Sequence, residues 1–223
     1  MAYPDDAKAL AHTLQALYGD LGDLPLLRET AAQRQKNDAA PSRSLASYAE
    51  EIQFCKKCVL HIGRSKLVFG RGSPQARVAF VGDFPSTKDD AAGEPFTDES
   101  GELLHKMIVA MKLKPEETYL TNIFKCRPPQ NQPVDQDLFR ACEAHLENQF
   151  EHLSAKFIVA MGEHSAKALA RSESPLNVLR NQVFEWNGRR VFCTYHPREL
   201  LNSPPKKKLA WEDLQAVMRE LSR

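Results

Sequence analysis

Four short apolar runs, each leading into glycine or polar residues, constrain the fold of this chain more than any other feature. They are rich in β-branched and aromatic side chains, and they are ARVAFVG (76–82), ETYLTNIF (117–124), FIVAMG (157–162) and RVFCTYHP (190–197). Stretches with helical character follow them at residues 99–112, 135–151, 163–170 and 207–221. Such alternation is typical of a parallel sheet with helices on both faces. We therefore predict an α/β fold, a three-layer α/β/α sandwich with a central, mostly parallel four-stranded sheet.

The predicted sheet also indicates where a functional site would lie. In open parallel sheets, ligands bind beyond the carboxyl ends of the strands. Those ends carry the segments GDFPS (82–86), TNIFKC (121–126), MGEHS (161–165) and TYHPREL (194–200). We expect the functional side chains mainly in these segments.

The first 50 residues differ in pattern from the rest of the chain. Four leucines spaced four, three and four residues apart predict a helix over residues 6–21; they are Leu10, Leu14, Leu17 and Leu21. Residues 22–45 are polar and have no sustained period, as in a linker. We predict a helical extension and linker over residues 1–50, and one folded domain over residues 51–223.

Composition excludes some classes of protein. The 223 residues include 30 basic and 29 acidic side chains, for a net charge of +1, which excludes a histone-like electrostatic binder. A local basic groove stays possible, because phosphate contact depends on where the charges lie. We see no membrane-length apolar run and no secretory signal at the N-terminus. We expect a cytoplasmic monomer that has no membrane partner.

The five cysteines suggest metal ligation or buried free thiols. An odd count without a signal peptide argues against a disulfide framework. Cys55 and Cys58 form a C-x-x-C motif, and Cys126 and Cys142 stand sixteen residues apart. Two pairs of thiolates fit either zinc or a four-iron four-sulfur cluster, although a redox motif and a core role for Cys142 are alternatives. Cys193 lies in an apolar run, and we expect it to be a small buried residue.

The strand-end motifs, taken in order, resemble those of one known family. They are GDFPS (82–86), GEPF (93–96), TNIFKCRPP (121–129) and YHPRELL (195–201), followed by WEDL (211–214). Together with the four cysteines, this set resembles the family four uracil-DNA glycosylases, the iron–sulfur members of the uracil-DNA glycosylase superfamily. The resemblance covers about residues 50–221. It implies the sandwich fold predicted above and a uracil-DNA glycosylase-like domain over residues 51–223.

The resemblance also implies a reaction and a cofactor. A protein of this family is a DNA repair glycosylase, which hydrolyses the N-glycosidic bond of uracil flipped out of DNA and initiates base excision repair. Its partner is DNA containing uracil. The cluster ligands would be Cys55, Cys58, Cys126 and Cys142, and the resemblance favours a 4Fe-4S cluster over zinc.

Each step of the reaction has a candidate residue. The carboxamide of Asn122 offers a donor and an acceptor that match uracil and mismatch cytosine. Phe96 is expected to stack on the flipped base. His196 is expected to donate a hydrogen bond to the departing uracil anion. The resemblance adds Gly82 and Phe84 to the substrate-binding set.

Asp83 is the candidate carboxylate, for orienting water or stabilising the sugar cation. The family pattern at this position is usually G-E-x-P-G, whereas this chain has GDFPS. Phe84 thus replaces a small residue and Ser86 replaces a glycine, two departures that bear on the rate and the substrate range. Asp89 is a second carboxylate in the same loop that could share this task, and we favour its interpretation as a solvated charge. We interpret His164, like five other histidines, as structural or exposed.

The segment after His196 supplies the candidate DNA contacts. Arg198, Leu200 and Leu201 are expected to act in the minor groove, and Lys206 to Lys208 either meet phosphates or begin a solvated helix. We find no lysine placed for Schiff-base chemistry, so we expect a monofunctional glycosylase. Two alternatives remain: a catalytically weak protein that binds uracil-containing or single-stranded DNA, and a zinc-stapled structural protein.

Overall fold

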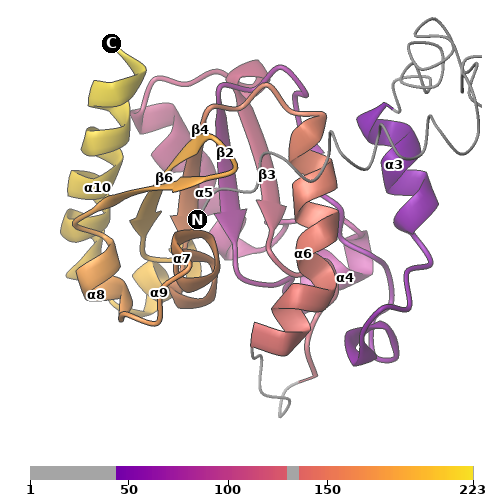
Figure 1. Cartoon of the computed structure of the whole chain (residues 1–223). Coiled ribbons are helices and arrows are strands. Elements are labelled where there is room, and N and C mark those ends of the chain that lie inside the picture. Colours follow the sequence, from indigo (N-terminus) through magenta and orange to yellow (C-terminus); the bar gives the residue numbers. More distant parts are fainter. Residues whose placement is uncertain (1–43, 130–135, 223) are drawn as a thin grey trace, which may run out of the picture. The chain divides into compact units, whose positions relative to one another are not determined.

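The computed structural model describes residues 44–129 and 136–222 (Figure 1). The helix expected over residues 6–21 lies outside the described residues, as does nearly all of the linker expected over residues 22–45. The compact unit that contains the sheet begins at Ser44. The division into domains over residues 1–50 and 51–223 therefore stays a prediction.

The described residues form one sheet in the order β1-β3-β2-β4-β6-β5. Its four inner strands run parallel; they are β2 (Val78–Gly82), β3 (Thr118–Asn122), β4 (Phe157–Met161) and β6 (Arg189–Thr194). Two antiparallel edge strands flank them, β1 (Arg71–Gly72) and β5 (Val183–Trp186). The prediction of an α/β fold is confirmed, whereas the prediction of a four-stranded sheet is wrong.

The sequence does carry a signal for β5. Asn187 and Gly188 separate β5 from β6, and both have positive φ angles of 48° and 74°. Two central residues in this region are typical of a type I′ hairpin turn, for which Asn-Gly is the preferred dipeptide. The hairpin adds β5 to the edge of the sheet.

The four helices predicted in the folded domain lie close to their expected positions, and the described residues form four more that were not predicted. In chain order, these helices are α3 (Leu45–Ile52), α4 (Thr87–Ala92), α5 (Glu99–Ala110), α6 (Gln136–Glu151), α7 (Glu163–Ala170), α8 (Leu176–Leu179), α9 (Pro197–Asn202) and α10 (Lys206–Leu221). Among the described helices, none is both long and apolar enough to cross a bilayer.

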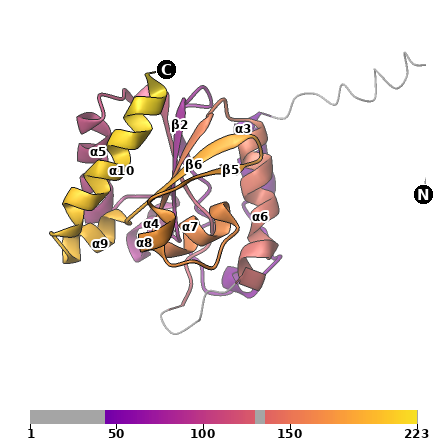
Figure 2. The ribbon, with the colours of Figure 1, turned by 60° about the vertical axis from the view of Figure 1, so that its left-hand side comes forward.

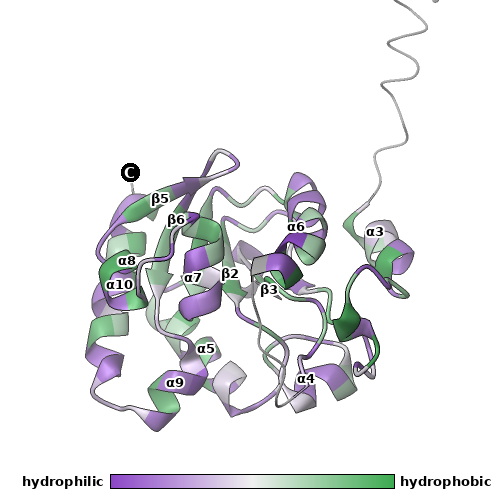
Figure 3. Cartoon of the chain, turned by 60° about the horizontal axis from the view of Figure 1, so that its bottom comes forward, coloured by the Kyte–Doolittle hydropathy of each residue, from purple (hydrophilic) through white to green (hydrophobic). Residues whose placement is uncertain are grey.

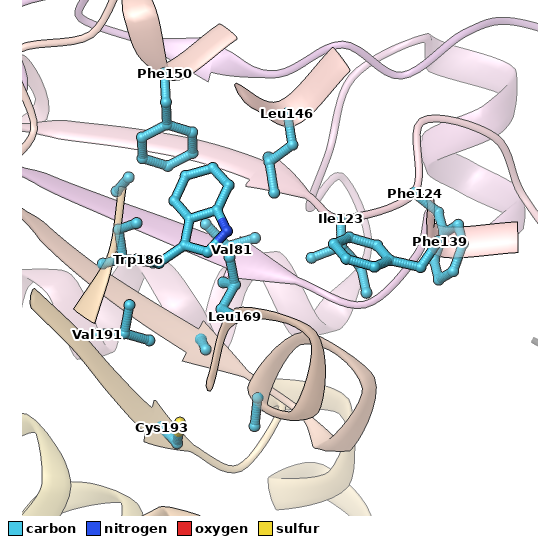
Figure 4. Close-up of a cluster of buried hydrophobic side chains, with 14 of the residues drawn as sticks. Val81, Ile123, Phe124, Phe139, Leu146, Phe150, Leu169, Trp186, Val191 and Cys193 are labelled. Carbon is cyan, nitrogen blue, oxygen red and sulfur yellow. The ribbon is translucent and has the colours of Figure 1, made fainter. Parts of the chain in front are cut away.

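Alternation along the strands divides the core into two clusters. Val78 and Phe80 of β2 pack with residues of α5 and α10, whereas Ala79 and Val81 pack with residues of α6, α7 and α8. Figure 2 shows α5 and α10 on one side of the sheet and α6 on the other. In the second cluster, the Trp186 ring meets Phe150 edge to face, with centroids 5.3 Å apart (Figure 4). Burial on both faces explains why β2 is apolar throughout.

The carboxyl ends of the parallel strands meet at one edge of the sheet. Figure 3 brings this edge forward and shows α4, α7 and α9 around it. Each of these helices follows a parallel strand in sequence, namely β2, β4 and β6. The segments that carry the candidate residues therefore lie together, as the rule for open parallel sheets predicts.

Candidate active site

Three of the predicted site residues converge on one point beside Gly82, the last residue of β2. A methyl group added to Gly82 would stand 2.5 Å from Asn122 Oδ1 and 2.8 Å from Phe96 Cζ. The same methyl group would stand 3.2 Å from His196 Nε2. Only glycine leaves room for all three side chains, since carbon contacts under 3.0 Å require something to move. The absence of a side chain at Gly82 therefore allows the Asn122 amide, the Phe96 ring and the His196 imidazole to approach one another.

Asn122 reaches this point because it ends β3 directly beside Gly82 in the parallel register. Its side chain is buried, and Nδ2 has no hydrogen-bond partner among the described residues. Leaving a buried donor unpaired costs about 1–3 kcal/mol, so such groups are rare in folded proteins. The unpaired Nδ2 of Asn122 is therefore available to donate a hydrogen bond to a ligand at this point.

Lys125 holds the main chain of Asn122, and sequence reasoning missed it. Its Nζ donates to Asn122 O at 2.9 Å, to Thr121 Oγ1 at 2.7 Å and to Gln149 Oε1 at 2.7 Å. Lys125 is 1% exposed, and this burial lowers its pKa to about 7. The sequence does contain a signal for this network. A lysine that directly follows a buried strand, as Lys125 does, needs buried hydrogen-bond acceptors for its charge.

Phe96 occupies a strained backbone conformation. Its φ of 57° lies in the left-handed region, which bulky residues rarely adopt and which costs about 1–3 kcal/mol. Its carbonyl accepts a hydrogen bond from Arg71 Nη2 at 3.0 Å. Gly101 permits the first turn of α5 to pack there, because a methyl group on Gly101 would stand 1.9 Å from Phe96 O. The ring stacks on His196 with centroids 5.8 Å apart and planes 22° apart.

Asp89 supports the same loop, so its interpretation as a solvated charge is wrong. Asp89 is 3% exposed, and its Oδ1 accepts from Thr97 N and Thr97 Oγ1, both at 2.7 Å. Its Oδ2 accepts from Ser86 N at 2.9 Å, which completes a capping box at the start of α4. Oδ1 of Asp89 thus fixes Thr97, the residue after Phe96, while Oδ2 caps the start of α4.

His196 is the N-cap of α9, and this position sets its tautomer. Its Nδ1 accepts the backbone N–H of Arg198 at 3.1 Å. In the neutral ring the proton therefore lies on Nε2, the nitrogen that faces Gly82. Burial lowers the pKa of His196, so the ring is neutral at pH 7. His196 presents an uncharged N–H donor to the convergence point.

Asp83 lies next to this point and faces the first turn of α7. Its Oδ1 accepts from Ser165 N at 2.7 Å, and its Oδ2 stands 3.4 Å from His164 Nδ1. Burial acts to raise the pKa of Asp83, but the His164 hydrogen bond, the charge that His196 carries when it is protonated at acidic pH, and the Ser165 N–H outweigh it. The pKa of Asp83 is lowered as a result, and the carboxylate is ionised at neutral pH.

Gly162 permits this arrangement. Its φ of 108° is one that glycine favours, and a methyl group there would stand 2.4 Å from Asp83 Oδ2. Phe84 lies beside the pair, with its ring edge to face with the His164 ring at 5.9 Å between centroids. The substrate-binding role expected of Phe84 stays a prediction.

The three residues predicted to contact DNA differ in how exposed they are to solvent. Leu200 is 1% exposed and belongs to the core, so it cannot enter a DNA groove, and its predicted role is wrong. Leu201, the next residue of α9, is 41% exposed. Arg198 is half-exposed and forms an ion pair with Asp98 at 3.4 Å.

The four candidate cluster ligands are free thiols close enough to influence one another. Cys126 and Cys142 are buried, while Cys55 and Cys58 are partly buried. Burial raises the pKa of Cys126, and the charges of Cys58 and Cys55 raise it further. Burial raises the pKa of Cys142 to about 11, with Cys126 and Cys58 adding to the shift. Among the described residues, no three histidine, cysteine or acidic side chains are grouped tightly enough to hold one metal ion.

Positive and polar groups surround these thiols. Arg64 Nη1 donates to Cys126 Sγ at 3.2 Å and to the carbonyl of Cys55 at 2.7 Å. Cys55 Sγ also lies 3.1 Å from His145 Nε2 on α6. Cys193 is buried within β6 at 1% exposure, as predicted.

Comparison with known proteins identifies the family. The model of the uracil DNA glycosylase superfamily matches residues 69–215. A type-4 uracil-DNA glycosylase of Sulfurisphaera tokodaii is 35% identical over 188 residues, which cover 80% of this chain and 85% of the relative. Type-4 enzymes of Saccharolobus solfataricus and Archaeoglobus fulgidus are 34% and 30% identical, covering 78% of this chain and 85% and 92% of their own length. The chain therefore belongs to the uracil DNA glycosylase superfamily, among its type-4 members, and the resemblance inferred from the motifs is confirmed.

Proposed function

We propose that this protein hydrolyses the N-glycosidic bond of uracil in DNA and so initiates base excision repair. Its family supports the reaction class, and the names of its relatives support uracil in DNA as the substrate. The target nucleotide must first leave the base stack, since its bond is not accessible inside a duplex. The observation that carries the proposal is the meeting of the Asn122 amide and the His196 imidazole beside Gly82.

In this proposal Asn122 recognises the base. Its Oδ1 accepts from uracil N3–H, and its Nδ2 donates to uracil O4. The unpaired state of Nδ2 in the free protein supports this role. Cytosine presents an acceptor at N3 and a donor at C4, which leaves the buried amide mismatched at both atoms. A site of this kind rejects the wrong base through its unpaired polar groups. Phe96 packs against the base from one side.

His196 acts on the leaving group. As the glycosidic bond breaks, negative charge develops on the uracil ring, and the N–H of Nε2 donates to O2. A fixed donor in a water-excluded site can contribute about 3–4 kcal/mol to such a transition state. The hydrogen bond from Arg198 N supports the required tautomer, and the lowered pKa supports a neutral ring.

Asp83 acts on the sugar side. Its ionised carboxylate orients the attacking water or stabilises the positive charge at C1′. Uracil departs with the electron pair of the broken bond, water forms the new bond to C1′, and the proton that the water loses passes to the Asp83 carboxylate or to the uracil anion. Because no enzyme amine takes part, the product is an abasic site in an intact strand.

We further propose that Cys55, Cys58, Cys126 and Cys142 bind a 4Fe-4S cluster. The family of the chain supports one shared site for these thiols, and the hydrogen bond from Arg64 would stabilise the thiolate form of Cys126 that ligation requires. When bound, the cluster would join the loop before residue 59, the exit of β3 and helix α6 without taking part in hydrolysis. Zinc remains the alternative occupant.

We also propose that DNA containing uracil contacts the surface beyond α9. Leu201 is exposed and follows His196 closely, so it can enter the space that a flipped nucleotide leaves. Arg198 can reach a phosphate if it exchanges its partner Asp98. The three-layer description of the fold, the monomeric state and the cytoplasmic location stay predictions.

One observation favours the alternative of a catalytically weak DNA-binding protein. Both oxygens of Asp83 already have partners, Ser165 N and His164 Nδ1. A carboxylate so engaged has fewer free lone pairs with which to orient water, although it can still stabilise positive charge at C1′. The excision assay separates the two functions, because a binder would retain uracil-containing DNA without turnover.

The test uses a labelled oligonucleotide that contains a single uracil, with substrate in excess over protein. Alkali then cleaves the strand wherever a base has been removed. We expect multiple turnovers on uracil and none on the same oligonucleotide with cytosine. Retention of the DNA without alkali-sensitive sites would contradict the proposed function.

A further inference from the structure

The Asp83 carboxylate is held on both oxygens by consecutive residues of α7. Ser165 donates its backbone N–H to Oδ1 at 2.7 Å, while the His164 ring faces Oδ2 at 3.4 Å. Among the described residues, no other side chain forms a hydrogen bond or ion pair with this carboxylate. The position of Oδ2 therefore depends on His164.

The arrangement suits an aspartate at this position. Asp83 is one methylene shorter than the glutamate usual in this motif, and it reaches α7 through the space that Gly162 leaves. The His164 ring is also fixed by its edge-to-face contact with Phe84, at 5.9 Å and 65°. At 45% exposure, His164 is not needed to fill the core. Its contacts are with Asp83 and Phe84, two residues of the GDFPS segment.

We propose that His164 is a positioning residue for Asp83, which fixes Oδ2 with an N–H donor and so aims the carboxylate at the reacting sugar. This inference deepens the proposed function and rests on it. It assigns His164 no contact with the substrate. The pair also accounts for the GDFPS segment, because Asp83 and Phe84 both contact the same imidazole.

The charged groups around Asp83 and His164 predict how the ion pair between these two residues depends on pH. The hydrogen bond with Asp83 raises the pKa of His164 most, burial lowers it, and Glu163 and Lys167 act from the same helix. On the other side, His196 acts on Asp83. Because the pKa of Asp83 is lowered and that of His164 is raised, the ion pair is complete between the two values. It is lost as pH rises through the pKa of His164.

The experiment measures single-turnover excision of uracil from pH 5 to pH 10 in three variants of the full chain. His164→Ala removes the donor, whereas His164→Gln keeps an uncharged one. Lys167→Met is the control, because it alters a charge on the same helix without contacting Asp83. We expect the excision rate of His164→Ala to fall about tenfold at pH 7. This loss is a fraction of the roughly 10²–10⁴-fold rate increase that a positioned acid or base contributes.

The pH profiles carry the decisive information. The wild type and Lys167→Met should both lose rate on the alkaline side. His164→Gln should recover most of the rate at pH 7 and show no alkaline loss, with DNA affinity unchanged within about twofold. A His164→Ala variant with the rate and profile of the wild type would overturn the inference and leave the proposed function intact.

A second measurement does not depend on activity. The pKa of His164, followed by NMR of its ring protons, should fall toward the ordinary imidazole value in Asp83→Asn. An unchanged pKa would overturn the ion pair. A wild type that excises no uracil at any pH would instead overturn the proposed function and this inference with it.

Discussion

Arg198 donates its backbone N–H to His196 Nδ1 at 3.1 Å, and this contact decides which imidazole nitrogen carries the proton. The other nitrogen, Nε2, faces Gly82 and the Asn122 amide. A helix cap and a hydrogen-bond donor are thus combined in one side chain. The start of α9 thereby fixes the tautomer that the proposed chemistry needs.

The first prediction concerns His196→Ala. Because His196 acts on charge that develops only in the transition state, excision should slow about 10²–10³-fold while DNA affinity changes little. Single-turnover rates and binding to a uracil-containing oligonucleotide measure the two effects. Equal losses in rate and affinity would show that His196 contributes to binding alone.

The second prediction concerns Gly82→Ala. The added methyl group would stand within 3.0 Å of Asn122 Oδ1 and Phe96 Cζ, so the side chains must separate. We expect a loss of about 1–3 kcal/mol in the free energy of unfolding and a large loss of excision. Urea denaturation and the excision assay measure both. Gly63→Ala is the control, since its methyl group would meet only Pro129 Cγ at 3.6 Å.

The third prediction concerns Lys125→Met. Methionine has a similar length but no donor, so the carbonyl of Asn122 and Oε1 of Gln149 lose their contacts with Nζ. We expect the free energy of unfolding to fall by about 2–4 kcal/mol, as for buried acceptors left unpaired. Urea denaturation measures the loss, and the exposed Lys156→Met is the matched control. Equal stabilities for the two variants would refute the supporting role of Lys125.

The fourth prediction concerns the proposed cluster. Cys142→Ser should remove a ligand and yield a protein without the broad visible absorbance of iron–sulfur proteins, with less iron per chain. Cys193→Ala changes a buried thiol outside the proposed set of ligands, so this variant should keep both the visible absorbance and the iron content of the wild type. Iron and zinc analysis of the wild type decides between the two metals. A colourless wild type with one zinc per chain would contradict the cluster.

Local patterns in the sequence predicted most of the parallel sheet and part of the site. The inner strands and the helices that follow them could be located, because buried strands and amphipathic helices have distinct periods. The TNIFKCRPP and YHPRELL motifs located Asn122 and His196 at the edge where they meet. The hairpin of β5 was missed, although Asn187 and Gly188 are its usual signal.

Contacts between distant segments could not be predicted in the same way. The pair of Asp83 and His164 joins residues 81 apart in sequence, and it depends on how β2 packs against α7. Leu200 and Leu201 are adjacent and similar, and only the orientation of α9 decides which one is buried. The capping box of Ser86 and Asp89 was a missed local signal, since its spacing is that of a helix start.

The most direct test of the central claim is the excision assay on paired uracil and cytosine substrates, performed with the wild type and Asn122→Ala. We expect the wild type to turn over uracil repeatedly and spare cytosine. Asn122→Ala should lose most of its rate on uracil and most of the difference between the two bases, while Asn181→Ala on the surface retains both. An Asn122→Ala variant that still excises uracil and rejects cytosine as the wild type does would contradict the claim that this amide reads the base.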